Sequence, residues 1–471
     1  MAKKYLVVST VAKGMDLNKP FKKALDVFCK DKNAQLKLLE VKANYKEDKF
    51  DPQIDQNLII KDDINFSRHI RVVHLEGLRA ETGSAVNRLE GFCGIEQTLV
   101  SAGTSVSLKS LASYPDADGN RALRFVTSTG AIVKPKYKNN IAGRIAKQNH
   151  NCGAVVLIRD DQGHSEFIHI VAAKDGSFVY VDKRYHPNGK ITKEKTVHTV
   201  LGDLHPISVD KKALAASLSM MKLVGTQDAF IHDADDFRNG QSHHLEGLNI
   251  TRAKLAMDGK LDIKQEQSEN GRVLKLIQDT IKGKSHIVAS NHNEHRDQAL
   301  ERGEFIFDPY SCEALLIQAL IKVHGGNAFQ ASLVAEDAIR KAVKEVVKKM
   351  NKHDYSGKVE IELMKDLDRT VFLDRSSNLS INKTMVAKHG DDGLGGARGS
   401  TETFTKLAQP GIYGHGHFEE WKKNVIRVAT LSRLNMDYNE GQATNWGHSL
   451  VNVFADGLAQ VIRIRNGRMI Y

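Results

Sequence analysis

The chain has few cysteines, and no two of them lie close together in the sequence. Its four cysteines, Cys29, Cys93, Cys152 and Cys312, are scattered along 471 residues with no CxxC pair among them. Neither a disulfide framework nor a thiolate zinc site is therefore expected. We interpret the cysteines as small buried hydrophobic residues of a protein in a reducing compartment.

Long hydrophobic runs are also absent. No apolar stretch approaches the roughly 18 residues that a membrane-crossing helix needs, so no membrane partner is expected. The opening MAKKYLVVSTVAKG is basic, but its apolar part is short and ends at Lys13, which does not fit a secretory signal. Internal repeats and low-complexity tracts are missing as well. These absences predict a cytoplasmic protein.

Acidic residues are outnumbered by basic ones. The chain has 68 Lys and Arg against 57 Asp and Glu, which gives a formal net charge of +11. Such an excess favours polyanionic partners, because each neutralised phosphate releases condensed counterions. Many basic proteins never bind nucleic acid, so charge alone leaves the partner open. The hydrophobic content of 41% and charged content of 27% are ordinary for a globular enzyme.

The length and the hydrophobic pattern predict an α/β protein of two domains. A chain of 471 residues is too long for one small core. Residues 1–197 are expected to form a mixed α/β accessory domain, because runs such as CGAVVLIRD and EFIHIVAA have strand length and β-branched content. In residues 198–471, strand-like runs such as VHTVLGDLH and DAFIHDADD alternate with helical stretches such as GRVLKLIQDTIKG. This alternation predicts a layered catalytic core.

Turn signals punctuate these runs. The pair Asp175-Gly176 lies between EFIHIVAA and SFVYVD and predicts a hairpin. The pair Asp456-Gly457 predicts a second hairpin near the C-terminal end. The polar segment 185–196 is interpreted as a linker or an exposed loop.

Polar clusters follow several strand-like runs in the second half of the chain. They occur in the order GDLH (Asp203, His205), HDADD (Asp233, Asp236), SNHNEH (Asn291, His292, His295), KHGDDG (His389) and GHGH (His415, His417). An α/β sheet gathers residues at its strand ends into a common crevice. Carboxylates, imidazoles and an amide suit borderline divalent metals such as manganese, iron or zinc. Two such ions about 3.5–4 Å apart can clamp the attacking and leaving oxygens of a displacement at phosphorus.

In this order the clusters resemble the sequence blocks of the calcineurin-like metallophosphoesterase superfamily. Those blocks are D-x-H, G-D-x-x-D-R, G-N-H-D/E, a lone H and G-H-x-H, and residues 198–471 contain all five. The resemblance implies a core of layered β-sheets flanked by helices. It also implies two divalent metal ions as cofactors, with Mn²⁺ as the first choice and Mg²⁺, Fe²⁺ or Zn²⁺ as alternatives.

The resemblance further implies a role for each residue. The first metal would be held by Asp203, His205 and His417, the bridging position would belong to Asp233, and the second metal would take Asn291, His389 and His415. His292 matches the histidine that protonates the leaving oxygen, and Asp236 matches the acid that orients it. A hydroxide ion held by the metals would be the nucleophile. Taken alone, His389 would be a surface residue and Asn291 a turn residue.

Two blocks depart from the family pattern. In the second block His232 replaces a glycine and Phe237 stands where the family often has arginine; in the third, Ser290 replaces a glycine and Asn293 an acidic residue. No ligand is lost, but the contacts to the scissile phosphate are left open. The candidates for these contacts are Arg238, His295, Arg296 and Arg398. Ordinary surface polar side chains are the alternative.

Three features favour DNA as the substrate: the net charge, the large first domain and the stretch KPKYKNNIAGRIAK. In that stretch, basic residues surround Tyr137, which suits contact with a phosphate backbone and stacking on bases; the basic residues are Lys134, Lys136, Lys138, Arg144 and Lys147. An ordinary solvated loop and helix start is the alternative.

The overall organisation and the run TLSRLNMDYNEGQATNWGHSLVNVFADG also resemble the early host-DNA-degrading nucleases of tailed siphophages. This narrower resemblance implies a manganese-preferring DNase of low sequence specificity that acts in the host cytoplasm, with a homo-oligomer as a further implication. A phosphomonoesterase or nucleotidase is the first alternative. A DNA-binding protein with a vestigial metal site is the second.

Overall fold

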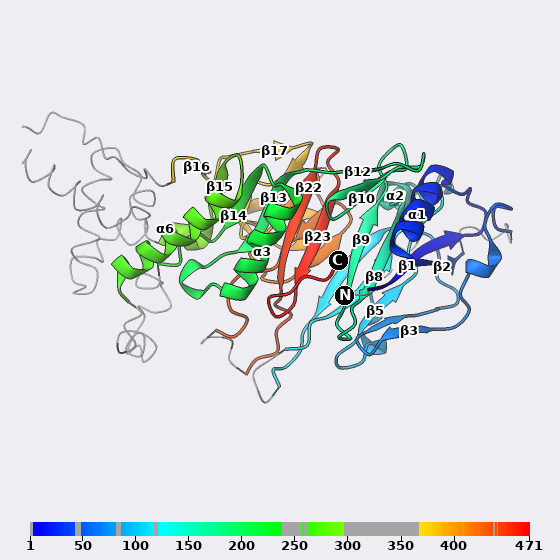
Figure 1. Cartoon of the computed structure of the whole chain (residues 1–471), viewed down its shortest axis with the longest axis horizontal. Helices are drawn as coiled ribbons and strands as arrows, with labels where there is room; N and C mark the ends of the chain where they lie inside the picture. The colour runs from blue at the N-terminus through cyan, green and yellow to red at the C-terminus, as the bar shows by residue number, and fades with distance from the viewer. Residues whose placement is uncertain are drawn as a thin grey trace, which may run out of the picture.

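The computed structural model describes residues 3–42, 49–81, 86–116, 121–237, 257, 261–295, 367–407, 409–436, 439 and 441–471. Within these ranges the chain forms four β-sheets flanked by few helices, so the predicted mixed α/β class is confirmed (Figure 1). In the same ranges, no helix is both long and apolar enough to cross a membrane. Two predicted phosphate contacts, Arg238 and Arg296, lie outside the described residues.

A four-stranded sheet lies in the N-terminal part of the chain. Its order is β2 (Gln35–Val41), β1 (Lys4–Ala12), β8 (Gly153–Arg159) and β9 (Ser165–Val171). Helix α1 (Lys19–Lys32) begins after Asn18, whose side chain accepts a hydrogen bond from the backbone of Phe21, as N-cap residues do. Phe28 of α1 packs against Tyr180 and Tyr185, which belong to a three-stranded sheet of β10 (Phe178–Tyr180), β11 (Lys183–Tyr185) and β12 (Ile191–Lys193).

A six-stranded sheet forms the middle of the molecule (Figure 1). Its order is β16 (Thr370–Phe372), β15 (Ser285–Ile287), β14 (Asp228–His232), β13 (Thr196–Asp203), β22 (His448–Phe454) and β23 (Ala459–Ile464). The first four strands run parallel, β22 is antiparallel to β13, and β23 is antiparallel to β22. Helices α3 (Lys211–Val224) and α6 (Ile263–Thr280) pack side by side against this sheet.

The fourth sheet has ten strands and combines distant parts of the chain. Its order is β17 (Ser380–Ile381), β18 (Thr384–Met385), β19 (Gly411–Tyr413), β21 (Val425–Arg427), β20 (Glu420–Lys422), β6 (Val106–Leu111), β7 (Arg124–Thr129), β5 (Thr98–Ser101), β4 (Ile70–Val72) and β3 (Ile64–Ser67). The junction is the antiparallel pairing of β20 with β6, where Trp421 faces Leu108. Strands from both sides of residue 197 therefore share one sheet. The division into two domains at that residue stays a prediction.

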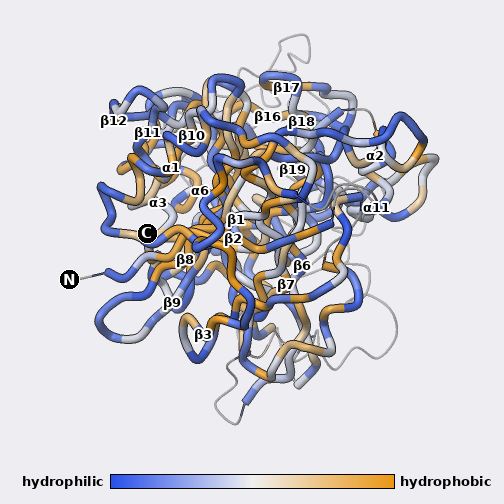
Figure 2. Tube along the Cα trace, turned by 90° about the vertical axis from the view of Figure 1, so that its right-hand side faces the viewer, coloured by the Kyte–Doolittle hydropathy of each residue, from blue (hydrophilic) through white to orange (hydrophobic). Residues whose placement is uncertain are grey.

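The apolar strands run through the interior, and the hydrophilic segments lie on the outside (Figure 2). One continuous cluster of buried hydrophobic residues extends from β1 to β23. The two ends of the chain lie close together, with the Lys3 ammonium 5.1 Å from the centre of the Tyr471 ring (Figure 1). The segments before and after the predicted boundary are thus packed on a common core.

The turn predictions had different outcomes. The Asp456-Gly457 hairpin is confirmed, since β22 pairs with β23 and Gly457 has a φ of 84°. A turn also forms at Asp175-Gly176, but the predicted hairpin is wrong because β9 and β10 belong to different sheets. In the segment 185–196, predicted to be a linker or an exposed loop, residues 188–193 are exposed, and residues 191–193 form β12, which pairs with β11.

Candidate metal centre

The predicted polar clusters meet where two sheets present the ends of parallel strands. Asp203 is the last residue of β13, and Asp233 directly follows β14, its parallel neighbour. His389 follows β18, and the GHGH block directly follows β19, which is parallel to β18 in the ten-stranded sheet. The carboxyl ends of parallel strands meet at one edge of a sheet. The structure therefore brings together residues that are far apart in the sequence.

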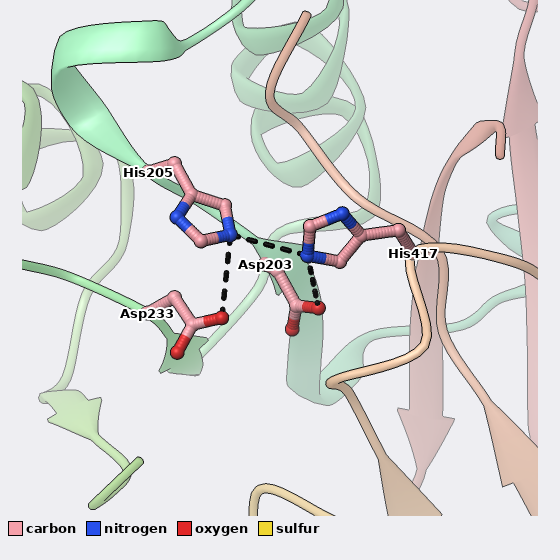
Figure 3. Close-up of side chains that lie close together, drawn as sticks. All are labelled: Asp203, His205, Asp233 and His417. Atoms are coloured by element: carbon pink, nitrogen blue, oxygen red, sulfur yellow. Dashed lines mark hydrogen bonds and ion pairs between the residues drawn. The ribbon is translucent and has the colours of Figure 1, made fainter. Parts of the chain in front are cut away.

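The centre of the cluster consists of Asp203, His205, Asp233 and His417 (Figure 3). Nε2 of His205 lies 3.2 Å from Nε2 of His417 and 3.3 Å from a carboxylate oxygen of Asp233. Nε2 of His417 lies 3.2 Å from a carboxylate oxygen of Asp203. All four side chains are buried, and one ligand atom from each lies within 4.8 Å of the others. This spacing is that of a group that can hold a metal ion.

His389 and His415 extend the cluster on the side of the ten-stranded sheet. Nε2 of His389 lies 3.4 Å from Asp233, and its Nδ1 lies 3.8 Å from Asp203. The His389 and His415 rings are 5.1 Å apart, and the backbone N–H of His415 donates to Asp203 at 3.0 Å. The backbone N–H of Asn291 donates to Asp391, two residues after His389, at 3.1 Å. Asp233 is thus in contact with both halves of the predicted ligand set.

The backbone of this region is strained. His205, Asp233, His415 and His417 all have positive φ values, between 43° and 69°. Residues other than glycine rarely adopt this conformation, and such strain is concentrated at functional sites. The sharp reversals after β13, β14 and β19 turn these side chains back toward one another.

Two glycines of the sequence blocks are required by close approach. A Cβ atom on Gly414 would lie 2.3 Å from an oxygen of Asp203 and 3.0 Å from Cγ of His232. A Cβ atom on Gly202 would lie 2.3 Å from the carbonyl oxygen of Ala429. Both contacts are far shorter than real Cβ contacts, so the close packing around Asp203 depends on glycine at both positions.

His292 lies at the solvent side of the cluster. Its side chain is 25% exposed, whereas that of Asp236 is 5% exposed, and Nδ1 of His292 is 3.5 Å from Asp236. The Nδ1–H group of His205 donates a short hydrogen bond to the same Asp236 oxygen. Asp236 therefore orients a predicted metal ligand as well as the predicted acid. Burial lowers the pKa of His292, but the charge of Asp233 and the hydrogen bond to Asp236 outweigh it and raise this pKa above its ordinary value.

The chemistry of the donor atoms fits a divalent cation. Among the described residues, buried atoms without a hydrogen-bond partner include Oδ2 of Asp203, Oδ1 of Asp233, Oδ1 of Asn291 and Nε2 of His389. The facing Nε2 atoms of His205 and His417 cannot both carry a proton and bond each other. Burial and the charge of Asp233 raise the pKa of Asp203, while the surrounding imidazoles outweigh burial and lower the pKa of Asp233. A cation would satisfy these atoms and relieve the repulsion between the carboxylates.

The departures from the family blocks have structural explanations. The Asn293 side chain accepts a hydrogen bond from the backbone of Asp235 at 3.0 Å and donates to the carbonyl of Val288 at 3.0 Å. It therefore joins the loop after β14 to the loop after β15. A carboxylate at this position could not replace it, because it has no N–H group to donate to the Val288 carbonyl. His232 fills space beside His389, with their Nδ1 atoms 3.3 Å apart. Burial lowers the pKa of His232 to about 4.

The predicted phosphate contacts are distributed around the site. His295 is half-buried, and its ring lies 5.2 Å from that of His292. Arg398 is exposed on the loop after His389, where it forms an isolated antiparallel β-bridge with Asp392. Their contact with a phosphate stays a prediction.

Sequence reasoning missed three residues around the site. The Trp446 ring lies 4.3 Å from that of His417. Asp391 accepts a hydrogen bond from Asn291, and Arg375 contacts Asp391. Asp391 could have been noticed within the KHGDDG block. Trp446 and Arg375 carry no local signal, because only the fold places them near the ligands.

The basic stretch 134–147 is exposed, as a polyanion-binding segment must be. It runs into helix α2 (Ile141–Asn149), and its basic side chains are all on the surface: Lys134, Lys136, Lys138, Arg144 and Lys147. Tyr137 is half-buried, and its hydroxyl group is 2.8 Å from Nδ1 of His150. Burial raises the pKa of Tyr137 to about 12. Stacking of bases on Tyr137 and contact of the basic side chains with a phosphate backbone both stay predictions.

Comparison with known proteins gives one finding of similarity. The chain is 26% identical over 404 residues to a protein of Escherichia phage T5 named "Protein A1". The alignment covers 83% of this chain and 65% of the phage protein, so the chain spans less than two thirds of the length of that relative. This similarity suggests a phage origin. No protein-family model and no solved structure matches the chain.

Proposed function

We propose that the chain is a phosphodiesterase that depends on two divalent metal ions and hydrolyses DNA, with a catalytic core of the calcineurin-like class. One observation carries the proposal: Asp203, His205, Asp233 and His417 converge in a buried group with the spacing of metal ligands. His389 and His415 adjoin this group through Asp233, which supports a second ion beside the first. Nitrogen and oxygen donors of this kind accept manganese, iron, zinc or magnesium, and we propose Mn²⁺.

The chain's own residues have separate tasks in this proposal. Asp203, His205 and His417 would hold one ion, Asn291, His389 and His415 the other, and Asp233 both. Bound divalent ions supply positive charge that lowers the pKa of a water molecule and polarises a phosphate. His292 would give its proton to the leaving oxygen, since its imidazole is partly exposed, lies beside Asp236 and has a raised pKa. Asp236 would hold the rings of both His292 and His205 in place.

DNA is the proposed substrate for reasons that lie outside the cluster. The net charge of +11 favours a polyanion, and the exposed basic stretch 134–147 offers phosphate contacts. The similarity to a phage protein fits an enzyme that degrades host DNA with low sequence specificity in the host cytoplasm. We propose residues 1–197 as the part that binds DNA or mediates assembly, and a homo-oligomer as the working form.

The first experiment combines metal binding with substrate choice. The purified chain is incubated with MnCl₂ and supercoiled plasmid, with and without EDTA, and in parallel with bis(p-nitrophenyl) phosphate and p-nitrophenyl phosphate. We expect plasmid cleavage and diester hydrolysis that EDTA abolishes. Intact plasmid together with rapid monoester hydrolysis would instead identify a phosphomonoesterase. DNA binding without hydrolysis of any of these compounds would identify a binding protein.

A substitution tests the role of the acid. His292→Asn should lower kcat for plasmid cleavage by about 10²–10⁴-fold, which is the usual contribution of a general acid, while Mn²⁺ affinity stays near that of the wild type. His164→Asn is the matched control, because His164 is an exposed histidine whose Nδ1 lies 3.1 Å from a carboxylate of Asp160. Unchanged cleavage by His292→Asn would show that the acid is another group.

A further inference from the structure

We propose that Arg375 is a positioning residue that fastens the loop carrying Asn291 and His292 to the loop carrying His389, and thereby sets the metal affinity of the site. This inference rests on the proposed function. Arg375 itself follows β16, the strand that pairs with β15, and it belongs to none of the sequence blocks. Its guanidinium group contacts carboxylates of both loops.

The guanidinium group of Arg375 bridges two loops with all of its donors in use. Its Nε and Nη2 atoms donate to the two oxygens of Glu294 at 2.6 and 3.1 Å. Its Nη1 and Nη2 atoms donate to the two oxygens of Asp391 at 2.8 Å each, and Nη1 also donates to Asp392 at 2.9 Å. A guanidinium group has five N–H donors in a fixed planar arrangement, and this geometry uses each of them. The bridge therefore fixes orientation as well as distance.

Each carboxylate in this bridge is next to predicted metal ligands. Glu294 lies on the same helical turn as Asn291 and His292. Asp391 is two residues after His389, and the oxygen that binds Nη2 of Arg375 also accepts the backbone N–H of Asn291 at 3.1 Å. The two loops thus meet at a shared oxygen atom, and Arg375 holds that atom in place.

The backbone of Arg375 makes a further link. Its carbonyl oxygen accepts a short hydrogen bond from the ammonium group of Lys388, the residue before His389. The segment after β16 is therefore joined to the His389 loop by both its side chain and its main chain. Displacement of this segment would move His389 relative to Asn291.

Charge makes Arg375 difficult to replace. Without it, the carboxylates of Glu294, Asp391 and Asp392 would face one another with no cation between them, and their repulsion would separate the two loops. A lysine would restore one charge, but its single ammonium group cannot bind two carboxylates in the bidentate manner. The side chain is 35% exposed, so its contribution to global stability is expected to be small. A positioning role therefore predicts an effect on metal binding that exceeds the effect on folding.

The test compares Arg375→Ala and Arg375→Lys with the wild-type chain by calorimetric titration with Mn²⁺. We expect Arg375→Ala to weaken Mn²⁺ binding by about 10–100-fold, as the loss of partners behind metal ligands does, and Arg375→Lys to recover little of it. Guanidinium ion, added below the concentration that unfolds the wild type, should restore much of the affinity of Arg375→Ala. At saturating Mn²⁺, kcat for bis(p-nitrophenyl) phosphate should return toward the wild-type value.

Arg184→Ala is the matched control for the loss of an arginine that joins two carboxylates. Arg184 binds Glu194 at 2.6 Å and Asp456 at 2.8 Å, away from the metal cluster. This variant should bind Mn²⁺ like the wild type. Circular dichroism and the thermal midpoint of each variant check that it is folded, and Arg375→Gln replaces Arg375→Ala should the latter fail to fold.

The possible outcomes separate this inference from the proposed function. Mn²⁺ binding and hydrolysis by the wild type, with unchanged binding by Arg375→Ala, would overturn the role of Arg375 and leave the proposed function in place. Equal weakening in Arg375→Ala and Arg184→Ala would also overturn it, since the effect would then be structural. A wild-type chain that neither binds Mn²⁺ nor hydrolyses the diester would overturn both, and the wild-type titration alone reveals that case.

Discussion

Arg463 lies where three of the sheets meet, and its replacement should reveal how they are held together. The side chain is 1% exposed on β23, and its Nε atom forms an ion pair with Glu419 at 2.5 Å. Its Nη1 atom donates to the carbonyl of Phe167 on β9 at 2.7 Å and lies 3.8 Å from Glu166. The guanidinium carbon is 3.9 Å from the centre of the Phe167 ring and 4.9 Å from that of Phe125 on β7.

These contacts set the expected magnitude for Arg463→Met. Removing one partner of a buried ion pair costs about 3–5 kcal/mol, because the remaining charge has no compensation. Burial, opposed by Arg463, raises the pKa of Glu419 to about 7, so this acid is already close to losing its charge in the folded state. Glu419→Gln should therefore change the free energy of unfolding by only about 1 kcal/mol. The double variant should be more stable than Arg463→Met by about 1–2 kcal/mol, because no unpaired acid at position 419 remains.

Urea unfolding measures these differences. Fluorescence reports on the two tryptophans, of which Trp421 on β20 is buried and lies two residues after Glu419, and far-UV circular dichroism reports on the whole chain. The two transitions must coincide before free energies are compared. Arg468→Met is the control, since Arg468 is exposed and its loss should change stability by about 0.5 kcal/mol or less. A cost below about 1 kcal/mol for Arg463→Met, or a double variant no more stable than the single one, would refute this account.

Two further predictions concern pH and the packing of the metal cluster. Burial and the charge of Arg463 lower the pKa of His169 to about 3. Between about pH 3 and pH 6.5, this histidine is therefore protonated in the unfolded chain and neutral in the folded one. The free energy of unfolding should fall by about 2 kcal/mol from this group between pH 7 and pH 5, and His169→Gln should flatten the urea-unfolding profile over that range; equal slopes in both proteins would contradict it. Gly414→Ala should lower Mn²⁺ affinity by about tenfold or more in a calorimetric titration, because its Cβ would lie 2.3 Å from Asp203. Gly91→Ala is its control, since a Cβ there meets no atom within 4 Å, and equal affinity of the two variants would count against the Asp203 geometry.

Some features of this protein followed from the sequence by itself. The apolar runs of β8, β13 and β14 were recognisable because a buried strand needs a short, continuous apolar segment. The Asp456-Gly457 turn was recognisable because glycine adopts the positive φ that the hairpin requires. Polar residues directly after such runs were expected to converge, and the grouping of Asp203, His205, Asp233 and His417 agrees with that expectation. These signals are local, so each could be read within a few residues.

The tertiary structure alone decided which strands pair and which distant side chains support the cluster. The turn at Asp175-Gly176 formed as its residues require, but β9 and β10 found partners in different sheets, since pairing depends on packing across the whole core. Tyr137 lies within a basic segment, yet its hydroxyl group is held by His150. Arg375 has no sequence pattern around it and gains its importance only because the fold places Glu294 and Asp391 on either side of its planar guanidinium group. Local sequence therefore determined strands, turns and candidate ligands, whereas long-range packing determined their partners.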